Sequence, residues 1–417
     1  MDKKRIAIIG AGVSGLTAAR LLQDKYDVII YEKADKPGGL IKCERVEGSL
    51  FHTCGGHVFN TKKQDVAQWF WGFFKQNEDF VKTDRNSVVQ FEQSVVPYPI
   101  ENHVYMMPSD VQSGFLDDCL NIAQGKVKPP TDFETFLRGR FGDTLYNLYF
   151  KPYNEKVWRC DLRNVSLAWL EGKLPMPTVK EMLFNNFNHV EEKQFVHSSF
   201  YYEKQNGSQF LADVLASGLN IIYNADISSL TYSDGKWHVA GQGYDKVIYC
   251  GNIKEMIDRL SGVDVAAFVP EVDALAYHGT TAVFCEIDAN PYSWIYLPSD
   301  KYACHRIICT GNFAQSNNAP SLPSDRITAT VEFTDAISKD DILDNLAKMP
   351  YHPRYITHRY HKYTYPIQTH STRQMILSLK QHLAQTSFYF TGRFADWEYY
   401  NMDVAMAAAM NVCQNLK

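Results

Sequence analysis

The sequence lacks a long hydrophobic run, an excess of basic charge and any regular cysteine motif, and each absence excludes a class of protein. No apolar stretch approaches the roughly 20 residues of a membrane-spanning helix. The net charge is −5, from 42 basic and 47 acidic residues, so no basic field points to nucleic acid or an anionic membrane. Nine cysteines without a CxxC pair argue against a disulfide scaffold or a zinc site. We therefore expect a soluble cytoplasmic protein.

Aromatic side chains, in contrast, are plentiful. The chain of 417 residues contains 25 Tyr, 24 Phe and 7 Trp, which suits broad stacking surfaces or a thick core. Its length exceeds what one hydrophobic core usually serves, so about two or three structural units are expected.

The beginning of the chain predicts a dinucleotide-binding fold. Residues 5–9 are a short apolar run typical of a buried parallel strand. A glycine-rich turn, a helical pattern and a second strand follow, and the second strand ends at Glu32. The glycines let a pyrophosphate approach a helix amino terminus. Glu32 can accept hydrogen bonds from ribose hydroxyls and would repel a 2′-phosphate, which disfavours NADP.

Two later segments favour FAD over NAD. A second glycine turn follows Glu32, and residues 387–394 form another strand pattern that ends in Gly-Arg before a final helical segment. A chain that returns at its end to the nucleotide-binding fold is typical of two-domain flavoproteins. The predicted cofactor-binding residues are Gly10, Gly12, Ser14, Gly15, Glu32, Lys33, Gly38, Gly39, Gly56, Ile227, Gly392, Arg393 and Met402.

The remaining patterns predict an α/β fold in which a Rossmann-type FAD-binding domain carries a helical insert and a second, antiparallel β-sheet domain. Residues 64–76 read as an aromatic helix, and residues 276–334 alternate as strands do. We expect discontinuous domains: an FAD-binding domain from residues 1–85, 203–258 and 375–417, a sheet domain from 86–103, 191–202 and 259–374, and a helical domain from 104–190.

Four segments, together with "VPYPIENH" at 96–103, resemble the UDP-galactopyranose mutases, more the eukaryotic type than the common bacterial one. They read GGHVFNT, PYNEKVW, SWIYLPSDKYACHR and GRFADWEYYNMD, at residues 55–61, 152–158, 293–306 and 392–403. The resemblance follows the same order along nearly the whole chain. The wider superfamily of flavin amine oxidases and protoporphyrinogen oxidases shares only the nucleotide-binding segments.

This resemblance implies a substrate site for a UDP-sugar, formed by Tyr98, Tyr149, Asn154, Trp158, Tyr296, Arg306, Tyr365, Tyr399 and Asn401. Tyr149, Asn154 and Trp158 fall where the family packs and hydrogen-bonds the uridine. Arg306 falls at a diphosphate-binding arginine, and its planar fork suits that role. Three tyrosines match phosphate-binding tyrosines, and Asn401 lies near a sugar-side acid or amide.

The resemblance also implies the chemistry. N5 of the reduced flavin attacks the anomeric carbon and displaces UDP, and the flavin–sugar adduct opens, recloses as a five-membered ring and is released when UDP returns. The implied catalytic residues are His57, Arg306 and Lys173, without a metal. The resemblance implies an isomerase of cell-surface polysaccharide biosynthesis that works with reduced FAD. NAD(P)H is a candidate reductant for the flavin, and a homo-oligomer is a candidate assembly.

One departure and two rival functions are left open by the sequence. Lys173 stands where the family carries an arginine on a mobile loop, so it or, alternatively, Arg159 or Arg163 supplies that charge. An N-acetylated or deoxygenated nucleotide sugar would fit equally well. The first rival function is an FAD-dependent oxidoreductase of the amine oxidase or protoporphyrinogen oxidase type, which predicts an apolar substrate channel. The second is a flavoprotein that has lost catalysis and only binds.

Overall fold

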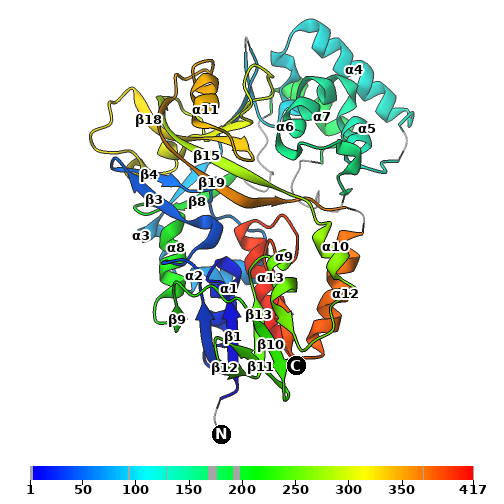
Figure 1. Ribbon diagram of the computed structural model, residues 1–417. Helices are drawn as coiled ribbons and strands as arrows, with labels where there is room; N and C mark the ends of the chain where they lie inside the picture. The colour runs from blue at the N-terminus through cyan, green and yellow to red at the C-terminus, as the bar shows by residue number, and fades with distance from the viewer. Residues whose placement is uncertain are drawn as a thin grey trace.

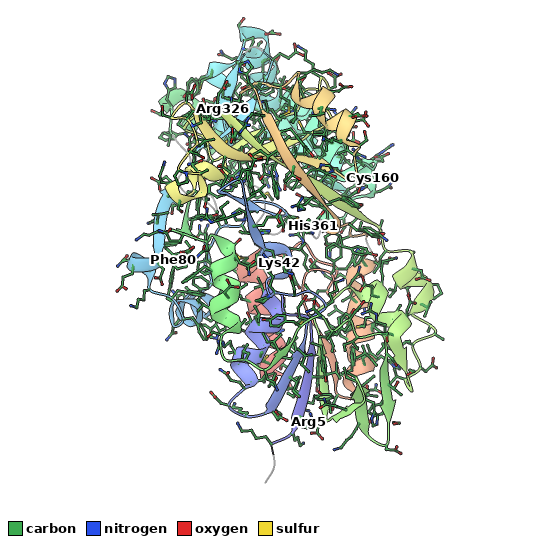
Figure 2. All side chains as sticks on the ribbon, turned by 60° about the vertical axis from the view of Figure 1, so that its left-hand side comes forward. Arg5, Lys42, Phe80, Cys160, Arg326 and His361 are labelled. Carbon is green, nitrogen blue, oxygen red and sulfur yellow. The ribbon has the colours of Figure 1, made fainter. Side chains whose placement is uncertain are left out.

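The computed structural model describes residues 3–92, 94–127, 129–167, 176–190, 198–369 and 371–416. Figure 1 shows two lobes: a lower one that contains β1, α1 and α13, and an upper one that contains β15, β18 and the helices α4 to α7. Figure 2 shows Arg5 at the base of the lower lobe, Arg326 in the upper lobe, and Lys42 and His361 near the junction. The cavity described below lies between segments of both lobes.

The lower lobe is built on a five-stranded sheet whose strands all pair in parallel. In spatial order its strands are β20 (Phe388–Phe390), β13 (Lys246–Tyr249), β1 (Arg5–Ile9), β2 (Asp27–Tyr31) and β9 (Ile221–Ile222). Its members come from the beginning, middle and end of the chain. The predicted return of the chain to the nucleotide-binding fold is therefore confirmed.

Both faces of this sheet are covered, which explains the uninterrupted apolar character of β1. Ile6 and Ile8 pack in one hydrophobic cluster with Leu16 of α1 (Val13–Leu22), whereas Ala7 and Ile9 pack in another on the opposite face. Helices α1 and α13 (Met402–Gln414) contact each other and lie side by side in Figure 1. Their amino termini therefore both come close to the carboxyl ends of the strands.

The upper lobe contains the second sheet that the sequence predicted, and this sheet has seven strands. In spatial order its strands are β19 (Arg354–Pro366), β15 (Tyr277–Asp288), β18 (Arg326–Thr334), β17 (Arg306–Ile308), β16 (Trp294–Tyr296), β6 (Ser87–Gln90) and β7 (Val95–Pro97). Its pairs are antiparallel except that β16 and β6 run parallel. That one parallel pair places the segment before β6 beside the cavity.

The helical insert consists of α4 (Ser109–Ala123), α5 (Phe133–Leu145), a π-helical turn (Tyr146–Phe150), α6 (Lys151–Trp158) and α7 (Val179–Asn188). The segment "PYNEKVW" is thus part of α6, and its buried face packs against a large aromatic cluster that also contains Tyr296 and Tyr365. No helix among the described residues combines the length and apolar character needed to cross a bilayer.

The remaining elements include one difference from the sequence prediction. The aromatic helix predicted for 64–76 is shorter: α2 ends at Trp71, and a separate turn of helix, α3, begins at Gln76. The other elements are α2 (Gln64–Trp71), α3 (Gln76–Asp79), β3 (Cys43–Val46), β4 (Ser49–His52), β5 (Phe80–Asp84), β8 (Ser199–Glu203), α8 (Ser208–Ala216), β10 (Leu230–Ser233), β11 (Lys236–Val239), β12 (Gln242–Tyr244), α9 (Ile253–Arg259), β14 (Leu260–Ser261), α10 (Val269–Asp273), α11 (Lys339–Leu346) and α12 (Thr372–Ala384). Strand β8 pairs with β5 in a separate ribbon.

Candidate active site

A cavity of about 300 Å³ brings together residues that are far apart in the sequence. Every residue predicted to bind substrate lines it: Tyr98, Tyr149, Asn154, Trp158, Tyr296, Arg306, Tyr365, Tyr399 and Asn401. The predicted catalytic residue His57 and the predicted cofactor-binding residues Gly56, Arg393 and Met402 line it as well. The wall is mixed, with aromatic rings, three guanidinium groups, carboxylates and amides.

The glycine turn after β1 forms a tight cradle below this cavity. Gly10 has a φ of +104°, which a side chain would strain, and a Cβ on Gly15 would lie only 1.9 Å from the carbonyl oxygen of Gly10. The backbone N–H of Gly38 donates to the Ala11 carbonyl at 2.9 Å, so the second glycine turn is tied directly to the first. Backbone rather than side chains therefore faces the place where a pyrophosphate would approach.

Glu32 is held at the end of β2 with both of its carboxylate oxygens already in use. It is 6% exposed, and it accepts hydrogen bonds from the backbone N–H groups of Ala11 at 2.6 Å and Ala34 at 2.9 Å. Each oxygen retains a second lone pair that could accept from a ribose hydroxyl. Lys33 is exposed, and Ile227 is buried in the cluster that also holds Tyr31.

The last part of the chain closes the cradle from the other side. Gly392 has a φ of +124°, and a Cβ there would lie 3.3 Å from Oγ of Ser14 at the start of α1. Met402 begins α13, so the amino termini of two helices meet the same cradle and favour negative charge there. The donor set, the glycines and Glu32 fit the predicted cofactor, FAD.

His57 lies on the cavity wall with an uncharged ring. Its Nε2 atom is buried and has no hydrogen-bond partner among the described residues, and its backbone N–H donates to Nδ1 of His52 at 3.3 Å. Burial, and after it the charge of Arg393, lowers the pKa of His57 to about 4. A neutral imidazole therefore faces the junction of the cofactor cradle and the cavity at neutral pH.

The end of the cavity that contains the predicted diphosphate-binding Arg306 is a row of residues set by strand register. Tyr296 on β16 pairs with Arg306 on β17, which pairs with Glu332 on β18. Nε of Arg306 donates to the Glu332 carboxylate, and Glu332 also accepts from the Gly55 N–H at 2.9 Å. Burial alone would raise the pKa of Glu332, but the positive charge of Arg306 holds it well below its usual range. The pair is therefore ionised and fixed in orientation.

Aromatic stacking connects this end to the cofactor cradle. The rings of Tyr365 and Tyr399 stack with centroids 5.3 Å apart, and the Arg393 guanidinium lies 3.9 Å from the centroid of Tyr399. Nη2 of Arg306 donates to the Tyr365 hydroxyl at 3.1 Å. A continuous set of contacts thus runs from a predicted cofactor-binding residue to the predicted diphosphate-binding arginine.

Four tyrosines, one of which is Tyr296, form an aromatic wall that continues from this end along the cavity. Tyr149 and Tyr153 stack with centroids 5.4 Å apart, and Tyr296 contacts Tyr153 and Tyr98 at 5.4 and 5.1 Å. Burial raises the pKa values of Tyr98, Tyr149 and Tyr153, so these phenols stay protonated. The wall offers flat faces for a planar ring and hydroxyl groups that can donate.

Asn154 and Trp158 support each other along α6. The Asn154 amide donates to the Phe150 carbonyl at 2.7 Å, and its oxygen accepts from the Trp158 indole N–H at 3.2 Å. Spacing of four residues places these groups on one helix face. Part of their hydrogen-bonding capacity therefore serves to fix the side chains that border the cavity.

The sequence offers three candidates for the cation that replaces the family's loop arginine. Lys173 lies outside the described residues. Arg159 is paired with Asp335 and Arg163 with Asp161, and both arginines line a separate surface depression instead of the cavity. The alternative in which Arg159 or Arg163 supplies the diphosphate charge finds no support in this geometry.

Arg85, Tyr153 and Glu332 line the cavity but did not emerge from the sequence. Tyr153 lies within "PYNEKVW", where its aromatic ring was a visible signal. Glu332 is a lone carboxylate among apolar and threonine residues of a strand pattern, and such a residue is seldom buried without a partner. No local signal marks Arg85, because its role depends on the pairing of β6 with β16.

The state of the cysteines and the arrangement of potential metal ligands bear on the chemistry that the site can support. All nine cysteines are free thiols. Within the described part of the chain, no group of three or more His, Cys, Asp or Glu side chains is arranged to hold a metal ion.

Comparison with known proteins identifies a Rossmann-like segment and relatives among sugar mutases. The profile of the NAD(P)-binding Rossmann-like domain matches residues 8–76. A dTDP-fucopyranose mutase of Escherichia coli is 23% identical, covering 98% of this chain and 97% of its own. A UDP-galactopyranose mutase of Mycoplasma genitalium is 24% identical, covering 62% of this chain and 63% of its own. The predicted resemblance to the UDP-galactopyranose mutases is confirmed.

Other matches extend to oxidases and to a solved structure. A coproporphyrinogen III oxidase of Staphylococcus aureus is 22% identical, covering 61% of this chain and 59% of the oxidase. Two of these three sequence relatives are therefore matched over less than two thirds of their own length. The crystal structure of a reduced UDP-galactopyranose mutase superposes with a TM-score of 0.87 at 20% identity, over 99% of this chain and 94% of the other. The predicted fold class is confirmed.

Proposed function

We propose that this protein is a flavin-dependent mutase that interconverts the pyranose and furanose forms of a nucleoside-diphosphate sugar, with UDP-galactopyranose as the first candidate. The observation that carries the proposal is a single cavity with an aromatic wall, an arginine–tyrosine end and His57 beside the cofactor cradle. A nucleotide sugar has matching parts: a planar base, a diphosphate and a sugar whose anomeric carbon must reach the cofactor.

The protein's own residues bind and orient the substrate. Arg306, fixed by Glu332, presents its remaining N–H groups to phosphate oxygens, and the Tyr365 and Tyr399 rings border that position. Stabilising the diphosphate matters for catalysis because it is the leaving group. The aromatic wall around Tyr153 holds the base, so the sugar is directed toward His57.

The chemistry that reduced FAD supplies when bound is nucleophilic attack on the anomeric carbon. The neutral His57 ring adds no positive charge next to the cofactor at pH 7. Arg393, stacked on Tyr399, links the two ligands.

The identity of the sugar and the identity of the base are both part of the proposal. UDP-galactopyranose follows from the resemblance, while the dTDP-fucopyranose mutase relative makes thymidine and a deoxygenated sugar the next candidates. In this proposal Lys173, which is not among the described residues, contributes positive charge for the diphosphate. We further propose a cytoplasmic enzyme of cell-surface polysaccharide biosynthesis, reduced by NAD(P)H and assembled as a homo-oligomer.

The test follows conversion of UDP-galactofuranose by the FAD-loaded protein. We expect chromatography to show UDP-galactopyranose when the protein is reduced anaerobically with dithionite, and no product with the oxidised protein, because only reduced flavin is nucleophilic at N5. Arg306→Lys should lower kcat/KM at least tenfold, since lysine cannot donate two parallel hydrogen bonds. Arg163→Met, outside the cavity, is the matched control and should behave as wild type.

Two outcomes would redirect the proposal. Conversion of dTDP-fucofuranose but not UDP-galactofuranose would keep the mutase reaction and change the substrate. Failure to bind either nucleoside diphosphate, together with oxygen-dependent turnover of an amine or porphyrinogen, would replace the mutase with the oxidase alternative. The charged wall formed by Arg85, Arg306 and Glu332 is poorly suited to the apolar channel that such an oxidase requires.

A further inference from the structure

Two arginine–tyrosine pairs that line the cavity are joined by hydrogen bonds, and the sequence singled out the arginine of only one of them. Nη2 of Arg306 donates to the Tyr365 hydroxyl at 3.1 Å. Nη2 of Arg85 donates to the Tyr296 hydroxyl at 2.5 Å. A guanidinium has donors only, so in each pair the phenol oxygen must be the acceptor.

This arrangement determines what the tyrosine can do next. Once the phenol oxygen accepts from a cation, its own hydrogen remains to be donated to another group. Donation from a cation also polarises the phenol, so the second hydrogen bond becomes stronger. Tyr296 is therefore biased toward ligand atoms that only accept hydrogen bonds, such as the oxygens of a phosphate.

Arg85 is held firmly enough for this role. Its Nε donates to Oγ of Ser87 at 2.6 Å, and its backbone N–H donates to the Ser198 carbonyl at 2.9 Å. Its guanidinium carbon lies 5.0 Å from the centroid of the Trp294 ring. A side chain held by Ser87, Trp294 and Tyr296 loses little further freedom when a ligand arrives.

Strand pairing places Arg85 and Arg306 on two sides of Tyr296. Arg85 lies two residues before β6, which pairs in parallel with β16, the strand of Tyr296. Arg306 is the antiparallel neighbour of Tyr296 on β17. The positive charge of Arg306 is balanced by Glu332 in a buried ion pair, so the charge of Arg85 adds to an end whose other arginine is partly neutralised.

We propose that Arg85 is a positioning residue that fixes Tyr296 as a hydrogen-bond donor to the diphosphate of the substrate. The proposal rests on the proposed function only in taking the ligand to be a nucleoside-diphosphate sugar. It implies that Arg85 and Tyr296 act as one unit. It also implies that they contribute to the binding of the phosphates and not to the binding of the nucleoside.

A double-mutant cycle on the FAD-loaded protein tests this unit. The variants are Arg85→Met, Tyr296→Phe and both together, and the probes are UDP and uridine, titrated by the change in the flavin spectrum. We expect each single change to weaken UDP binding by about tenfold, the size of one charge-assisted hydrogen bond. The double change should be only about threefold or less worse than either single change, because the second removes an interaction that is already lost.

Two further variants separate positioning from simple packing. Arg85→Lys keeps the charge and one donor, so its affinity for UDP should lie between wild type and Arg85→Met. Arg163→Met changes an arginine in a different surface depression and should bind UDP as wild type does. Uridine affinity should stay within about twofold of wild type in every variant, because uridine has no phosphate to accept the hydrogen bond.

The possible contrary results have different meanings. If the losses of UDP affinity multiplied, to about a hundredfold in the double variant, the inference would be overturned and the proposed function would remain intact. Equal losses for uridine and UDP would also overturn it, because they would show that Arg85 only supports the wall beside Trp294. If wild type bound neither UDP nor dTDP, both the inference and the proposed substrate class would be contradicted.

Discussion

At the residue scale, the site depends on charges that are paired inside the protein. Glu332 is completely buried, yet it stays ionised because Arg306 and the Gly55 N–H compensate its charge. Breaking one partner of such a pair leaves an uncompensated buried charge and is far more costly than the pair itself is stabilising. Glu332 therefore holds Arg306 in one orientation, as the proposed role of Arg306 toward the diphosphate requires.

His52 is a second buried group, and it gives stability a defined pH dependence. Its Nδ1 accepts from the His57 backbone N–H and its Nε2 contacts the Tyr202 hydroxyl at 2.8 Å. Burial, and then the neighbouring His57, lowers the pKa of His52 to about 3, against about 6.5 in an unfolded chain. Between these values the unfolded chain binds more protons, so stability is lost as the pH falls from about 6.5 toward 3.

We expect the thermal midpoint of the FAD-loaded protein to fall steadily between pH 7 and pH 5. Between pH 7 and pH 8 the titration of His52 should change the midpoint little. The His52→Asn variant should start from a lower midpoint but show a shallower fall, because the buried imidazole is gone. Differential scanning calorimetry measures both. His238→Asn, at an exposed position, is the control and should keep the wild-type slope. A slope that is unchanged in His52→Asn would contradict the assignment.

At the element scale, helix α6 holds the loop between β16 and β17 through one lysine. Nζ of Lys156 donates to the carbonyls of Leu297 and Tyr302 at 2.8 Å and of Cys304 at 3.1 Å, and also to the Ser299 carbonyl. Burial lowers the pKa of Lys156 to about 8, so it is still mostly protonated at neutral pH. The strands joined by this loop carry Tyr296 and Arg306.

We therefore predict that Lys156→Met lowers the free energy of unfolding by about 1–3 kcal/mol, since several buried carbonyls lose their donor. UDP binding should weaken severalfold as well, because the loop then positions Arg306 less well. Urea unfolding and UDP titration test the two effects. Lys151→Met changes a half-exposed lysine on the same helix and serves as the matched control. If both variants behaved alike, α6 would not hold the loop in this way.

At the scale of the whole molecule, the two ligand sites share one set of contacts. The segment with Arg393 and Tyr399 returns to the nucleotide-binding fold, while Tyr365 and Arg306 belong to the seven-stranded sheet. The stacked pair of tyrosines joins these parts. Ordering one ligand site should therefore help to order the other, and by linkage the effect must be reciprocal.

We expect UDP to raise the thermal midpoint of the FAD-loaded protein more than that of the apoprotein, because FAD pre-orders Arg393 and the rings stacked on it. In the converse titration, UDP should tighten FAD binding by the same factor by which FAD tightens UDP binding. Thermal unfolding at saturating UDP measures the first effect, and equilibrium titration of FAD the second. Equal shifts for both forms of the protein would show that the two sites are independent.

Much of the fold could be predicted because its strongest features are local. The run at 5–9, the glycine turn and Glu32 predict their strand, turn and carboxylate from neighbouring residues alone. The helix predicted for 64–76 is too long because the aromatic pattern continues past Trp71, where α2 ends. The site was predicted as far as the short motifs extend, and the residues predicted to bind substrate do meet in one cavity.

The sequence by itself determined that a parallel nucleotide-binding sheet would form, because strand periodicity and glycine turns are local properties. Its short motifs also carried the family resemblance from which the candidate nucleotide-sugar residues were predicted. Only the tertiary structure decided that Arg85 lies against Tyr296, that Glu332 holds Arg306, and that Arg159 and Arg163 lie outside the cavity. The physical reason is register: these neighbours belong to strands and helices tens to hundreds of residues apart, and their alignment depends on how whole sheets pair and pack.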